Sequence, residues 1–266
     1  MINHIKKNQR ELTFVSLFVL SAMFTGNIFS DDFSKYNNDE VITHVMETYS
    51  RVYSATGRIT RTVEADGAKR SNTGKFTVKK PDRLYVEYVG EDHQITVHDG
   101  KTLRIFFAEH NKGIYKNTED MIPMERFILG PEPFFGNVLQ LMGKEFTIKL
   151  ADMTSGNLIL KAEPEKPLQL NFILIAINPE NWTIQAIEYF DTTNKLVSQT
   201  RYYEFKSEGD SLYFPTKTIT STIIQDKLLV ETLELSRVQL NYKFNDDIFS
   251  VPGNKETEWV LQEDNQ

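Results

Sequence analysis

The chain contains no cysteine. That absence excludes disulfide bonds, thiol chemistry, cysteine-ligated metals and lipid attachment through a cysteine. Histidine is scarce, with five in 266 residues, and no apolar run reaches the roughly 20 residues of a membrane-spanning helix. The 30 basic side chains are outnumbered by 37 acidic ones. This balance argues against binding to nucleic acid and against docking on an anionic membrane surface.

The N-terminus has the order of a secretory signal. Three basic residues precede an apolar segment at residues 15–24, and small and polar residues follow as far as Ser30. A basic head, an apolar middle and a small residue at the cleavage point are typical of a signal peptide. An uncleaved membrane anchor is the alternative, but the apolar run is short for a span. We therefore expect residues 1–30 to be removed.

The rest of the chain reads as one helix followed by strands. Residues 38–55 carry apolar side chains at three- and four-residue spacing, which predicts a helix. Beyond Gly57 the period changes to two, and Asp-Gly turns at Asp66 and Asp99 indicate tight hairpins. The pattern predicts about eleven strands. Because the few helices do not alternate with the strands, the predicted fold class is mainly β. We expect an unclosed antiparallel β-barrel with a helical lid.

Few residues suggest catalysis. His93 and His98 are five residues apart on one predicted strand, so they point to opposite faces and cannot share a metal ion. No zinc-protease, nucleophile-elbow or phosphate-loop motif is present. His98 and Asp99 with Ser71 can be imagined as a hydrolase triad, but triads are defined by geometry. We expect no enzyme activity, no cofactor and no metal site.

An apolar insert at residues 121–143 separates two groups of strands. It is rich in methionine and phenylalanine, and a short helix is expected over residues 134–142. So many apolar side chains must cover something. Either they close over a flexible apolar ligand, which methionine suits, or they plug the barrel. The predicted lid residues are Phe127, Phe134, Phe135, Val138, Leu139 and Met142.

Several short motifs, taken in order, resemble the outer-membrane lipoprotein carrier (LolA-like) family. Residues 74–84 resemble its block of glycine, apolar strand, basic pair and proline, and residues 95–103 resemble its Asp-Gly-Lys hairpin. Residues 133–134 match the start of its lid helix, and residues 244–253 resemble its closing strand. The resemblance spans residues 38–253.

This resemblance implies a periplasmic carrier or chaperone. It would shield the acyl chains of lipoproteins, or of related lipids, between an inner-membrane donor and an outer-membrane acceptor, and we expect a monomer. The domain would span residues 31–253, followed by a loose polar tail at 254–266. A non-carrier envelope binding module or sensor, using the same barrel to bind a lipidated or protein partner, is the alternative.

The resemblance also places the lipid-binding cavity. The expected cavity residues are Phe76, Val78, Lys80, Leu84, Val86, Tyr88, Leu103 and Ile105. In the family an arginine before the proline helps to hold the closed lid, whereas this chain has Lys80 there. Lysine is a point charge and cannot make the planar bidentate contact of arginine. Lys80 points either into the cavity or to solvent at the end of its strand.

Overall fold

A computed structural model describes residues 34–90, 93–121, 139, 145–208 and 212–262. Within these residues fourteen strands form one sheet, with one α-helix, α2 (Asn38–Ser50), and three short 3₁₀ turns. In chain order the strands are β1 (Ser54–Ala65), β2 (Ala68–Lys79), β3 (Arg83–Val89), β4 (Gln94–Asp99), β5 (Thr102–Phe107), β6 (Lys112–Asn117), β7 (Phe146–Thr154), β8 (Asn157–Pro164), β9 (Leu170–Asn178), β10 (Thr183–Asp191), β11 (Leu196–Glu208), β12 (Leu212–Ile224), β13 (Lys227–Leu240) and β14 (Glu258–Leu261).

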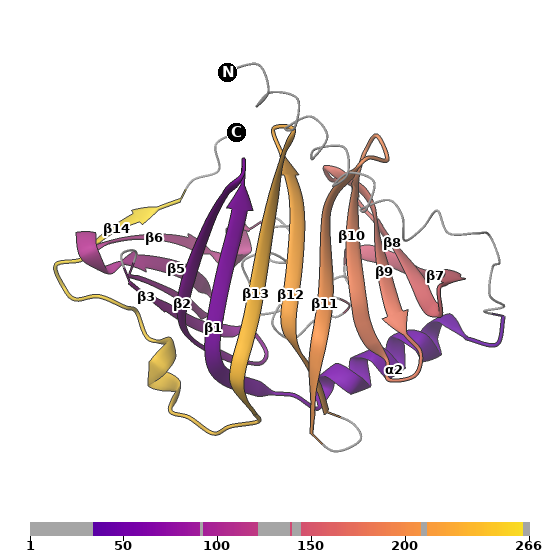
Figure 1. Ribbon diagram of the computed structural model, residues 1–266, viewed down its shortest axis with the longest axis horizontal. Helices are drawn as coiled ribbons and strands as arrows, with labels where there is room; N and C mark the ends of the chain where they lie inside the picture. Colours follow the sequence, from indigo (N-terminus) through magenta and orange to yellow (C-terminus); the bar gives the residue numbers. More distant parts are fainter. Residues whose placement is uncertain (1–33, 91–92, 122–138, 140–144, 209–211, 263–266) are drawn as a thin grey trace, which may run out of the picture.

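The sheet consists of two antiparallel meanders joined at one seam. Strands β1 to β6 follow one another, strands β7 to β13 do the same, and β1 pairs with β13. Strands β7 and β14 lie at the two ends of the strand order, so the sheet is not closed. In Figure 1 both flanks recede behind the central strands. The predicted fold class, an unclosed and mainly β barrel, is confirmed.

The hairpins predicted from the sequence are present in the structure. Asp66 and Gly67 both have positive φ, 51° and 77°, which is the backbone of a type I′ turn. Ala65 and Ala68 therefore pair directly. At the next such turn the Asp99 carboxylate accepts hydrogen bonds from the backbone N–H groups of Lys101 and Thr102, both at 2.9 Å.

One apolar cluster forms where α2 packs on the sheet, and we call the covered face the inner face. Asn37 caps the helix by accepting a hydrogen bond from the Asp39 N–H at 2.9 Å. The helix buries Val41, Val45 and Tyr49. At a bulge in β10 the Ile184 N–H donates to the Tyr49 hydroxyl at 2.8 Å, which holds the helix on the sheet. The strands contribute Leu158, Leu160, Ala162, Ile173, Ile175, Ile177, Ile184, Ile187, Tyr189 and Tyr202.

A second apolar cluster lies on the same face, near the start of β1 and the end of β13. It contains Phe76 and Phe214, which are 0% and 1% exposed. Its other buried members are Val52, Ala55, Ile59, Val78, Leu84, Val86, Tyr88, Val238 and Leu240. These side chains are buried together, and substitutions that change the volume of closely packed side chains are costly.

Several boundaries differ from the sequence predictions. The helix ends at Ser50 rather than at residue 55, and β6 and β14 add strands that the pattern did not indicate. Residues 244–253 contain a 3₁₀ turn, η3 (Asp246–Phe249), where a closing strand was expected. The tail expected to be loose contains β14, which pairs in parallel with β6. The Trp259 ring of β14 packs against Gly113 of β6. A Cβ atom at Gly113 would lie only 2.3 Å from this ring.

Gly74 provides a test of how closely β2 and β3 approach. A Cβ atom at this position would lie 1.9 Å from the Glu87 carbonyl oxygen, so the backbone must shift to accept any side chain. We expect Gly74→Ala to lower the free energy of unfolding by about 2 kcal/mol, measured by urea titration. The exposed neighbour Thr73→Ala is the control, with an expected loss below about 1 kcal/mol. Equal losses in the two variants would contradict the close approach.

Candidate functional site

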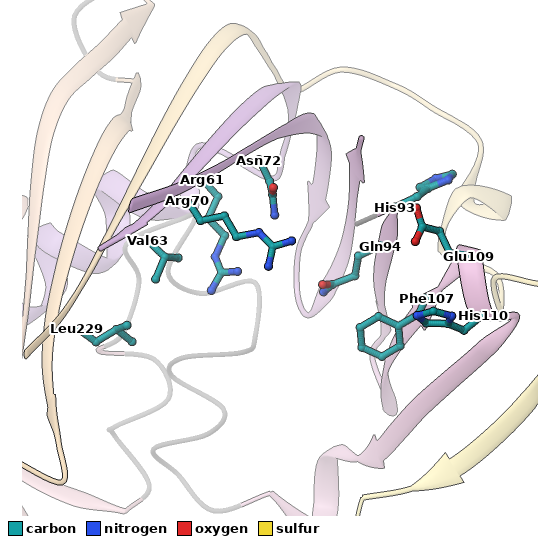
Figure 2. A pocket seen from close by; sticks show the side chains of 10 residues that line it. All are labelled: Arg61, Val63, Arg70, Asn72, His93, Gln94, Phe107, Glu109, His110 and Leu229. Atoms are coloured by element: carbon teal, nitrogen blue, oxygen red, sulfur yellow. The ribbon is translucent and has the colours of Figure 1, made fainter. Parts of the chain in front are cut away.

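An open pocket of about 540 Å³ lies on the inner face of the sheet. In Figure 2 the side chains of Arg61, Arg70 and Asn72 lie on one side of a common space, and those of Gln94 and Phe107 lie on the other. The lining side chains come from strands β1, β2, β5 and β13, from the start of β4 and from the turn after β5. The lining residues are Arg61, Val63, Arg70, Asn72, His93, Gln94, Phe107, Glu109, His110 and Leu229.

The strand register fixes which side chains share the face of the pocket. Residues directly opposite in an antiparallel pair share a face, and so do alternate residues along a strand. Leu229 in the pocket lies opposite Thr222 of β12, and Thr222 lies opposite Ser198 of β11. Ser198 in turn lies opposite Tyr189, a member of the helix-covered cluster. The pocket, a row of hydroxyl groups and the α2 cluster therefore lie on one continuous face.

Two of the ionisable side chains that line the pocket, Arg61 and His93, each contact a carboxylate. The Arg61 guanidinium donates through Nε and Nη2 to the same Glu231 oxygen, at 2.7 and 2.5 Å. His93 Nε2 lies 3.1 Å from the carboxylate of Glu87. Burial raises the pKa of Glu87, but hydrogen bonds from Lys75, Tyr85 and His93 outweigh it and lower the pKa to about 2. Glu87 is thus ionised at neutral pH.

The predicted cavity residues lie beside this pocket rather than in its lining. Phe76, Val78, Leu84, Val86 and Tyr88 are brought together on the inner face, all buried in the second apolar cluster. Leu103 is buried and Ile105 partly buried on β5. The cluster continues into the pocket along the strands. On β1, Ile59 of the cluster precedes Arg61 of the pocket by two residues, and on β2, Phe76 of the cluster follows Asn72 of the pocket by four.

The side chain of Lys80 is partly buried and contacts the helix on the inner face. Its ammonium group donates a hydrogen bond to the backbone carbonyl of Tyr49, in the last turn of α2. A cation at a helix C-terminus satisfies carbonyl groups that lack a partner within the helix and interacts favourably with the helix dipole. Burial lowers the pKa of Lys80 to about 8. Lys80 therefore joins the end of β2 to the end of the helix.

Of the predicted lid, only Leu139 is described. It is 3% exposed and belongs to the apolar cluster that α2 covers. Phe127, Phe134, Phe135, Val138 and Met142, like the signal at residues 1–30, lie outside the described residues.

The residues considered for hydrolase chemistry are not brought together. The ring nitrogens of His98 contact the Asp82 carbonyl and the Thr118 hydroxyl. The Asp99 carboxylate binds Arg104 at 2.5 Å instead, and the Ser71 hydroxyl lies 3.1 Å from that of Thr62. Within the described ranges no group of three or more His, Asp and Glu side chains is placed to hold a metal ion. No helix there is long and apolar enough to cross a membrane.

The sequence analysis did not identify the polar residues that line the pocket, although the sequence contains a signal for them. Arg70 and Asn72 have the same parity as Phe76, so the alternation that identifies Phe76 as inward-facing also turns them inward. Arg61 follows the buried Ile59 in the same way. Apart from Lys80, the residues assigned to the cavity were hydrophobic or aromatic ones.

The comparisons with known proteins bear on the fold. No family model matches the chain, and no curated protein matches it by sequence. A LolA superfamily protein from Nitrosomonas europaea matches with a TM-score of 0.58 at 16% identity, covering 81% of this chain and 98% of that one. A DUF1329 family protein from Desulfovibrio piger gives 0.59 at 12%, covering 80% and 96%. A domain from Vibrio parahaemolyticus named for outer membrane lipoprotein sorting gives 0.58 at 9%, covering 80% and 97%. At these identities the likeness shows that the chain has the LolA-like fold.

The position of Lys80 predicts a pH effect on stability. Its pKa is about 8 in the folded protein and about 10.5 in the unfolded chain, so between these values the unfolded state binds more protons. The contribution of Lys80 to the free energy of unfolding should therefore rise from about pH 8 to about pH 10.5 and stay constant below pH 8. Urea titrations of the wild type and Lys80→Met should diverge in that window, whereas the exposed Lys101→Met should follow the wild type. Parallel curves for wild type and Lys80→Met would exclude the buried position.

Proposed function

We propose that this protein is a periplasmic carrier that binds the acyl chains of a lipoprotein, or of a related lipid, on its inner face. The observation that carries the proposal is the open pocket beside an apolar cluster, on the inner face of an unclosed sheet. The fold shared with a LolA superfamily protein and with a domain named for lipoprotein sorting supports it.

The physical basis is the cost of exposing an acyl chain to water. Transfer of such a chain to an apolar surface is worth about 0.8 kcal/mol per methylene. Val63, Phe107 and Leu229 supply apolar surface in the pocket, and the neighbouring cluster would extend it if the packing opens. In this proposal the insert around Leu139 acts as the lid, and an inner-membrane donor and an outer-membrane acceptor load and unload the carrier.

A second candidate is a binding module or sensor that does not carry cargo. The apolar cluster around Phe76 favours it, because its side chains already bury one another where an acyl chain was expected. The carrier must bind an apolar ligand reversibly in the pocket, whereas the binding module need not.

Phe107 offers a direct test of the carrier. Its ring lines the pocket and is 37% exposed, so an acyl chain bound there should cover it. We expect Phe107→Ser to weaken binding of a fluorescent fatty acid about tenfold. The reason is that burying part of a phenylalanine side chain is worth about 1–2 kcal/mol.

The matched control is Val89→Ser. Val89 is 56% exposed and has the parity of Tyr85 and Glu87, on the opposite face of β3 from the buried Tyr88. Titration of the probe by fluorescence should give the wild-type affinity for this control. A Phe107→Ser protein that binds as tightly as the wild type would argue against the pocket as the acyl site.

A further inference from the structure

The polar side chains of the pocket offer both donors and acceptors. Asn72 and Gln94 each carry an amide that can do both, Glu109 adds a carboxylate, and Arg70 and His110 add donors. Figure 2 shows Arg61, Arg70 and Asn72 on one side of the space and Gln94 and Phe107 on the other. A purely apolar ligand would remove water from these polar groups without offering them hydrogen bonds, at a cost for each group that it desolvates.

The charge arrangement favours a neutral ligand over an anion. The Arg61 guanidinium is held by two contacts to Glu231, and His93 is held by Glu87. An anionic group near Arg61 would have to compete with the Glu231 carboxylate and would also face Glu109. A hydroxyl group has no such conflict, because it both donates and accepts hydrogen bonds and carries no charge.

Phe107 adds a flat apolar wall. It lies opposite Gln94 in the pairing of β4 with β5, so a ring-shaped ligand can stack on the aromatic face while the amide reaches its edge. The face of an aromatic ring carries partial negative charge and attracts C–H groups with partial positive charge. Sugars present such C–H groups on one face of the ring and hydroxyl groups around its edge.

Hydroxyl side chains continue from the pocket along the inner face. The hydroxyl oxygens of Ser198 and Thr222 lie 2.9 Å apart, and those of Thr200 and Thr220 lie 3.1 Å apart. Thr222 lies directly opposite Leu229 of the pocket. These four side chains form a polar stripe between the pocket and the apolar cluster under α2.

We propose that the pocket binds the neutral polyhydroxyl head group of an amphiphile, such as the sugar of a glycolipid. Asn72 and Gln94 hydrogen-bond the hydroxyl groups, and Phe107 stacks on the ring. This assignment rests on the proposed function for the apolar part of the ligand, which lies along Val63 and Leu229. It adds the chemical class of the head group.

The test uses probes that share one chain and differ in head group. Decyl glucoside, decyl galactoside and decyl maltoside supply sugars, decyl sulfate an anion and decyl phosphocholine a zwitterion, all below their micelle concentrations. Affinities are measured by calorimetry on protein purified without detergent. We expect the tightest sugar probe to bind at least tenfold more tightly than decyl sulfate and decyl phosphocholine.

The variants Asn72→Leu and Gln94→Leu should remove that preference and leave the affinity for decyl sulfate unchanged. Thr73→Val, an exposed neighbour of Asn72 on the other face of β2, is the matched control and should retain the preference. Retention of the preference in both leucine variants would overturn the assignment of these amides.

The remaining outcomes separate the head-group assignment from the carrier. Equal affinity for all the decyl probes overturns the sugar site and leaves the carrier standing. Tighter binding of decyl sulfate overturns the sugar site in favour of an anion site, and tighter binding of decyl phosphocholine overturns it in favour of a site for a zwitterionic head group. Free maltose that binds as tightly as decyl maltoside supports the sugar site and overturns the carrier. Failure of every probe to bind overturns both.

Discussion

The pairing of β1 with β13 is the constraint on which the rest of the molecule depends. It joins the two meanders and runs from Ala55 opposite Leu240 to Ala65 opposite Leu229. Asn241 fixes one end of the seam, where its side chain accepts from the Tyr53 N–H at 2.8 Å and donates to the Arg51 carbonyl at 3.0 Å. The ion pair of Lys227 with Asp66, at 2.6 Å, lies at the other end. A slip of one residue would turn every side chain of one meander to the opposite face, so this register determines what the inner face contains.

The polarity of the inner face changes from one flank of the sheet to the other. A cluster covered by α2 lies on one flank, a stripe of serine and threonine hydroxyls follows on β11 and β12, and the mixed pocket lies over β1, β2 and β5. The second apolar cluster adjoins the pocket along the strands. A face with apolar and polar zones in contact matches an amphiphile better than a bare hydrocarbon chain. Lys80 connects this face to the helix, because its ammonium group holds the last turn of α2.

Much of the sheet could be predicted from the sequence because strand periodicity and Asp-Gly turns are local signals. The turn at Asp66 and Gly67 needs positive φ at both residues, and this dipeptide is suited to it. The tail strand β14 could not be predicted, because it depends on the Trp259 ring packing beside Gly113, far away in the chain. The pocket was missed for a different reason. The parity that turns Phe76 inward also turns Asn72 and Arg70 inward, but apart from Lys80 the residues assigned to a lipid cavity were hydrophobic or aromatic ones. The surroundings of His98 and Lys80 are tertiary contacts that spacing does not encode.

The central claim is that the inner face holds an amphiphile. The most direct measurement is mass spectrometry of organic extracts from the protein, purified without detergent from the cells that produce it. The account predicts a lipid or an acylated peptide in a ratio near one to one with the protein. Protein that yields no lipid, and that also takes up no lipid when mixed with vesicles of its native envelope, would contradict it.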